Sequence, residues 1–131
     1  MSKLCGLAIV AVFVVWQIMD FIIHTIILAP QYAATASLWR PEGEMKMGLM
    51  MVVSLIGATC FCLVYDRFFA NKNIKNGALY GLIWGIGVGS SMGHGTYSVM
   101  PLPYALALGW FLATVAAAVV AGVLVGVIIK E

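Results

Sequence analysis

Charged residues are scarce in this chain. Only 9% of its 131 residues are Asp, Glu, Lys or Arg, whereas a soluble domain contains about 25%. Hydrophobic residues make up 63% of the chain, and a soluble domain of this length could not bury that much apolar surface. The net charge of +2 is too small to indicate a nucleic-acid partner. The composition therefore predicts an integral membrane protein that lies in a lipid bilayer.

The sequence also lacks the common motifs of catalysis and cofactor binding. It contains no phosphate-binding glycine loop, no CxxC pair and no serine–histidine–acid set. Its three cysteines, Cys5, Cys60 and Cys62, lie inside apolar runs, where we interpret them as small packing residues. These absences argue against a self-contained enzyme and predict no catalytic residue.

Four apolar runs make up most of the chain, at approximately residues 4–28, 46–69, 77–97 and 104–129. A hydrocarbon core about 30 Å thick needs about 20 apolar residues in a helix, and each run is long enough. The first run is too long for the hydrophobic region of a signal peptide, so we interpret it as a retained helix. The sequence predicts an all-α fold, with residues 1–131 forming one four-transmembrane-helix bundle.

Lysine and arginine are unevenly divided between the two sides that four spans would define. Five of the seven cationic residues share the side of both termini, and only Arg40 and Lys46 lie on the other. Cytoplasmic loops carry the excess of Lys and Arg, so we expect both termini to be cytoplasmic.

Glycine recurs at every fourth position of the third run. Residues four apart lie on one row of a helix, and a row without side chains allows another helix to approach closely. We therefore predict that this helix packs closely on a neighbour, either within the chain or in a second copy, as in a glycine zipper. The row consists of Gly77, Gly81, Gly85, Gly89 and Gly93.

Asp20 is the only acidic residue well inside an apolar run. An ionised carboxylate inside a membrane costs several kcal/mol unless it is paired, so we expect it to face protein or water. Gln17 and His24 lie near the same helix face, and His94 reaches a similar depth on the third run. We expect Asp20 to contact a histidine.

Three interpretations of the polar cluster of Gln17, Asp20, His24 and His94 remain open. The cluster could be a structural clamp, or part of a proton or solute path in which Asp20 titrates. It could instead hold a ligand: a divalent metal through Asp20, His24 and His94, or a b-type haem between the two histidines. The spacing matches no established metal motif, so the sequence favours no bound cofactor.

Several short segments resemble a group of small bacterial four-span membrane proteins of unknown function. They are Asp20-Phe-Ile-Ile-His24, Tyr32, Ala36-Ser-Leu-Trp-Arg-Pro-Glu42, Gly93-His-Gly-Thr-Tyr97 and Leu102-Pro-Tyr104. The resemblance implies a multi-pass protein of the bacterial inner membrane and implies no substrate.

Together these features predict a small non-catalytic membrane module. It would act as a homo-oligomer or as an accessory subunit of a larger membrane complex. The alternative is a small transporter, or a haem- or metal-holding protein, that uses Asp20, His24 and His94.

Overall fold

A computed structural model describes residues 2–130, and every regular element in that range is helical. The all-α prediction is therefore confirmed. The elements in chain order are α1 (Lys3–Asp20), the π-helical η1 (Phe21–Ile27), α2 (Ala29–Ala34), the short 3-10 helices η2 (Ala36–Leu38) and η3 (Glu42–Glu44), α3 (Met47–Phe68), α4 (Ile74–Gly89), the π-helical η4 (Ser90–Gly95), α5 (Thr96–Val99) and α6 (Tyr104–Ile128).

Three helices of the described range are long and apolar enough to cross a membrane: Lys3–Ile27, Met47–Phe68 and Tyr104–Ile128. These helices indicate a multi-pass membrane protein. The remaining long segment begins with the 16 residues of α4 and continues through η4 and α5. It is less apolar because five glycines alternate with its aliphatic residues and two serines and His94 follow. The structure thus gives three of the four predicted spans by length and composition.

The start of one helix differs from the predicted start, for a local reason. α4 begins at Ile74, before the predicted Gly77, because the side chain of Asn73 accepts a hydrogen bond from the backbone N of Asn76 at 2.9 Å. The first span ends at Ile27. Pro30 follows it in the first turn of α2, where a missing N–H costs no hydrogen bond.

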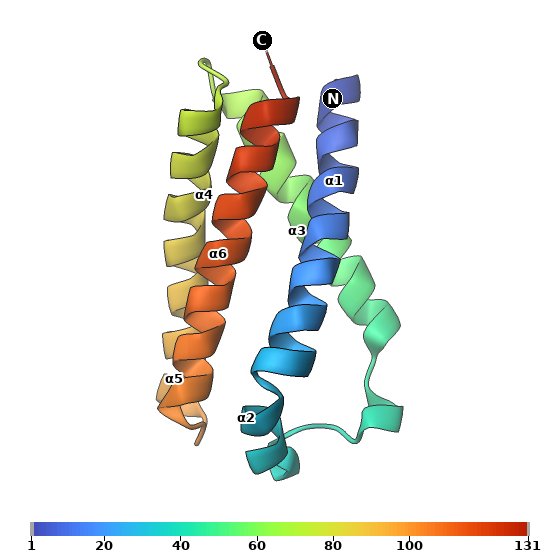
Figure 1. Cartoon of the computed structure of the whole chain (residues 1–131), viewed down its shortest axis with the longest axis vertical. Helices are drawn as coiled ribbons and strands as arrows, with labels where there is room; N and C mark the ends of the chain where they lie inside the picture. Colours follow the sequence, from blue (N-terminus) through green and yellow to red (C-terminus); the bar gives the residue numbers. More distant parts are fainter. Residues whose placement is uncertain (1, 131) are drawn as a thin grey trace.

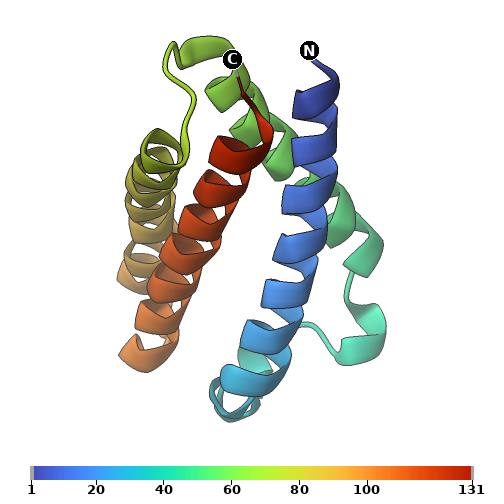
Figure 2. The ribbon, with the colours of Figure 1, turned by 45° about the horizontal axis from the view of Figure 1, so that its top comes forward.

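The helices pack in the order α4, α6, α1, α3 (Figure 1). α6 contacts both α4 and α1, and α3 crosses behind α1 in both ribbon views (Figure 2). α1 begins and α6 ends at one end of the molecule, which we call the termini end. The opposite end, which holds α2 and the start of α6, is called the aromatic end.

α4 and α6 form the most extensive helix contact in the molecule. All five glycines of the predicted row are buried. A Cβ atom added at Gly81 would overlap the backbone carbonyl oxygen of Ala118, and one added at Gly93 would lie 2.6 Å from that of Ala107. Gly87, on another face of α4, has no atom within 4 Å of such a Cβ.

The largest buried cluster lies toward the termini end. Val12 of α1, Phe61 and Tyr65 of α3, and Val125 of α6 are each fully buried there. The hydroxyl of Tyr80 donates a 2.8 Å hydrogen bond to the carbonyl oxygen of Phe61, which ties α4 to α3. Cys5 and Cys62 are buried members of this cluster, in line with a packing role, whereas Cys60 is exposed.

Trp16, one turn after Val12 on α1, links three helices. Its indole Nε1–H donates a 2.9 Å hydrogen bond to the carbonyl oxygen of Ala117 on α6. Its ring packs edge-on against Phe61 of α3, with the centroids 5.8 Å apart. The helices therefore converge around Trp16 and the termini end.

The first half of α3 has no buried face. Every residue from Arg40 to Val53 is exposed, and Ser54 is the first that is partly covered. This half of α3 leaves α6 and α4 on the far side of α1 (Figures 1 and 2). A helix with an apolar surface on all sides is accommodated by lipid or by another protein.

Candidate functional site

A chain of hydrogen bonds at the aromatic end joins three elements. The Nε1–H of Trp110, on α6, donates to the hydroxyl oxygen of Tyr32, on α2, at 2.7 Å. The same hydroxyl lies 2.6 Å from Nδ1 of His24, in η1. Tyr32 therefore connects the end of the first span to the start of the last.

Counting donors assigns the direction of these bonds. An indole N–H only donates, so Tyr32 accepts from Trp110 and keeps one O–H to donate. No other acceptor is found for that O–H among the described residues, so it donates to Nδ1 of His24. His24 is accordingly a neutral imidazole with its proton on Nε2.

Aromatic and apolar side chains enclose Tyr32. Trp39 packs edge-on against both Tyr32 and Trp110, with centroids 5.6 and 5.9 Å away. The buried Thr35 accepts a 2.8 Å hydrogen bond from Nε1 of Trp39, which fixes the ring. Burial raises the pKa of the Tyr32 hydroxyl above its usual value, while the hydrogen bond from Trp110 opposes this rise. The phenol therefore stays protonated at neutral pH.

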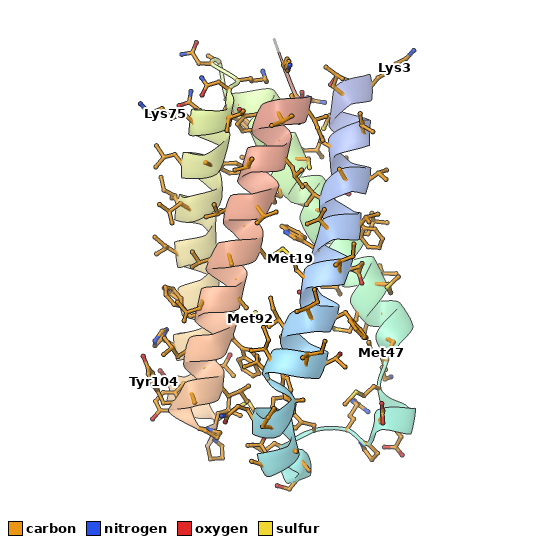
Figure 3. All side chains as sticks on the ribbon, in the orientation of Figure 1. Lys3, Met19, Met47, Lys75, Met92 and Tyr104 are labelled. Atoms are coloured by element: carbon orange, nitrogen blue, oxygen red, sulfur yellow. The ribbon has the colours of Figure 1, made fainter. Side chains whose placement is uncertain are left out.

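Figure 3 places Tyr104 at the same end of the molecule, where it meets the second histidine. Nε2 of His94, in η4, lies 3.0 Å from the hydroxyl oxygen of Tyr104, at the start of α6. The His94 ring also packs edge-on against Phe111, at a centroid distance of 5.3 Å. Each histidine thus lies in a π-helical segment and contacts a tyrosine from the next part of the chain.

Asp20 and His24, for which we predicted a contact, are near enough to interact electrostatically but are not joined by a hydrogen bond. Asp20 is exposed, and no hydrogen bond or ion pair joins it to any of residues 2–130. Two features explain the missing hydrogen bond: Tyr32 occupies Nδ1 of His24, and the helix changes to π geometry directly after Asp20. Because hydrogen bonds in a π-helix join residues five apart, the four-residue spacing from Asp20 to His24 is not one regular α-helical turn.

Gln17, the remaining member of the predicted cluster, contacts α3 instead. Its Nε2 donates a 2.8 Å hydrogen bond to Oγ of Ser54. Asp20 lies one turn beyond Gln17 on α1, and Met50 lies one turn beyond Ser54 on α3, both toward the aromatic end. Both are exposed, so the facing surfaces of the two helices are uncovered beyond this hydrogen bond.

The described residues do not assemble the predicted ligand sites. No hydrogen bond or ring contact joins His24 to His94, since each is engaged by its own tyrosine. Residues 2–130 contain no group of three or more His, Cys, Asp or Glu that could hold a metal ion. The described residues therefore do not gather Asp20, His24 and His94 into one set of metal donors.

The sequence did not predict Tyr32 as the partner of His24, nor Trp39 and Trp110 as the partners of Tyr32. The signal available was the presence of Tyr and Trp in the first loop and near the start of the last run. No family model, curated protein or solved structure matches this chain.

Proposed function

We propose that this chain is a small non-catalytic membrane module that assembles with another protein within the bilayer, as a homo-oligomer or as an accessory subunit. The observation that carries the proposal is Asp20, an exposed carboxyl on a helix long and apolar enough to cross a membrane, with no hydrogen bond or ion pair to any of residues 2–130. A carboxylate in hydrocarbon costs several kcal/mol, and a donor on a neighbouring protein would offset that cost.

The surface beside Asp20 supports this proposal. Beyond the Gln17–Ser54 hydrogen bond, the first half of α3 is exposed on every side, including Met50 and Met51. Methionine side chains are flexible and adapt to different neighbours, which suits them to a contact surface. We name the surface formed by Asp20, Met47, Met50 and Met51 the Asp20 face.

The proposal includes a specific arrangement in the bacterial inner membrane. The segment Ile74–Val99 crosses as a fourth span, with its glycine row as the seam against α6, and both termini face the cytoplasm. The support for the fourth span is its contact with α6 along the hairpin, and the support for the seam is the overlap of added Cβ atoms with the α6 backbone. The support for the orientation is the positive charge near both termini.

Replacing Asp20 tests the proposal. Asp20→Leu removes the polar group and is expected to weaken assembly by about ten-fold or more, whereas Asp20→Asn keeps hydrogen-bonding atoms and retains part of it. Assembly is measured as the size distribution of the purified protein in lipid nanodiscs and of its complexes in native membranes. Ile18→Ala, at an exposed position on the opposite side of α1, is the matched control.

Two results separate the outcomes. Loss of assembly in Asp20→Leu but not in Ile18→Ala supports the proposal. An unchanged size distribution in Asp20→Leu, together with a more stable monomer, would show that Asp20 simply faces lipid.

A further inference from the structure

The termini end carries a shallow open depression between the start of α4 and the end of α6, with a volume of about 560 Å³. One part of its wall is cationic, with Lys72, Lys75 and Lys130, and another is apolar, with Ile74, Gly126 and Val127. The described residues that line it include no acidic side chain. Figure 3 shows Lys75 at this end of the molecule, together with Lys3.

The depression lies where an apolar helix gives way to charge. Val127 is one of the last residues of α6, whose 25 residues form the longest α-helix described, and Lys130 follows directly after the buried Ile129. In a bilayer this level is the boundary between acyl chains and headgroups, where lysine ammonium groups reach the lipid phosphates.

The loop that presents the lysines is ordered by its own hydrogen bonds. The buried Tyr65 hydroxyl lies 3.0 Å from both the N and the O atom of the Asn73 backbone. The side-chain amide of Asn76 donates a 2.8 Å hydrogen bond to the carbonyl oxygen of Asn71. The backbone beside Lys72 and Lys75 is therefore held in place before any ligand binds, which lowers the entropy lost on binding.

We propose that this depression binds an anionic phospholipid, with the ammonium groups of Lys75 and Lys130 on the headgroup phosphate and Ile74 and Val127 against the adjoining acyl chain. Basic pockets between membrane helices bind anionic headgroups in this way. A zwitterionic lipid adds a cation that the lysines repel. A free phosphate ion has no apolar chain to pack against the apolar part of the wall. The site lies at the opposite end from the aromatic cluster and does not depend on the proposed assembly.

Lipid binding to the purified full-length protein in neutral detergent tests the proposal. Native mass spectrometry is used to titrate phosphatidylglycerol, phosphatidylcholine and, as a competitor, inorganic phosphate. The variant Lys75→Gln/Lys130→Gln lacks both proposed contacts. The variant Lys3→Gln/Arg67→Gln removes the same charge from helix ends outside the depression and is the matched control.

The unmodified protein is expected to bind phosphatidylglycerol in preference to phosphatidylcholine. Because each lysine near an anionic headgroup contributes about 1 kcal/mol, Lys75→Gln/Lys130→Gln is expected to bind about 30-fold more weakly. Lys75→Arg/Lys130→Arg keeps the charges and is expected to restore binding, which separates the lipid contact from any effect on folding.

Three results would overturn the site. The first is equal binding of the two lipids. The second is a loss of affinity in the control variant as large as that in Lys75→Gln/Lys130→Gln, and the third is competition by inorganic phosphate as effective as that by the lipid. The second of these would indicate a general attraction of positive charge to the surface, and the third a bare anion site.

Discussion

Among individual side chains, Tyr32 organises the aromatic end because its one hydroxyl serves two partners. It accepts from Trp110 and donates to His24, and the side chains of all three are partly or fully covered. Removing that oxygen leaves a donor and an acceptor without partners, each away from water. An unsatisfied buried polar group costs about 1–3 kcal/mol.

Tyr32→Phe is therefore expected to destabilise the protein by about 1–3 kcal/mol. The measurement is reversible unfolding in mixed micelles, followed by tryptophan fluorescence. Tyr97→Phe is the matched control because the Tyr97 hydroxyl forms no hydrogen bond among the described residues. Equal stability of Tyr32→Phe and the unmodified protein would show that the Trp110–Tyr32–His24 chain contributes nothing.

The sequence identified His24 and Asp20 as unusual residues but not their surroundings. Helical spacing placed them on one face, and that inference assumed an unbroken α-helix. A π segment has no distinctive composition, so the start of η1 at Phe21 could not be predicted from the sequence. The partner of His24 comes from a loop residue whose position depends on how α2 folds back, and periodicity does not describe such a contact.

Among the helices, α4 and α6 depend on the absence of side chains at their contact. An added methyl group at Gly81 would overlap a backbone carbonyl oxygen of α6, which cannot rotate away as a side chain can. The helices would have to separate, and forced overpacking costs about 1–3 kcal/mol. The larger Gly85→Leu change would act in the same direction, since an added Cβ there lies 2.8 Å from the Cα of Val115.

Gly81→Ala is expected to lower stability by about 1–3 kcal/mol, although alanine is the better helix former. Gly87→Ala makes the same chemical change on the same helix, where an added Cβ has open space, and is expected to be neutral or stabilising. Thermal unfolding of both variants in the same lipid mixture gives the comparison. Similar shifts in the two variants would mean that the glycine row is not a packing seam.

The helices themselves were predictable because lipid leaves the backbone few alternatives. A chain without water around it must satisfy its hydrogen bonds internally, so long apolar runs become helices. The divergence of α3 from the bundle was not predictable, since its first half is as apolar as a packed helix would be. Only the fold shows that residues 40–53 have no covered face.

For the molecule as a whole, orientation is the simplest property to test. Both termini and the loop that carries Lys72 lie at one end, and we expect that end in the cytoplasm. In a variant without native cysteines, Lys72→Cys is expected to resist a membrane-impermeant thiol reagent in intact cells, and Gly43→Cys is expected to react. The reverse labelling pattern would contradict the proposed orientation.

We propose that the Asp20 face meets protein rather than lipid. Photo-crosslinking within native membranes tests it most directly, with a photoreactive residue at Met50 on that face and, for comparison, at the exposed Ile83 of α4. We predict a discrete protein adduct from position 50, either a dimer of this chain or one defined partner, that is lost in Asp20→Leu, and lipid adducts alone from position 83. Lipid adducts alone from both positions would contradict the claim.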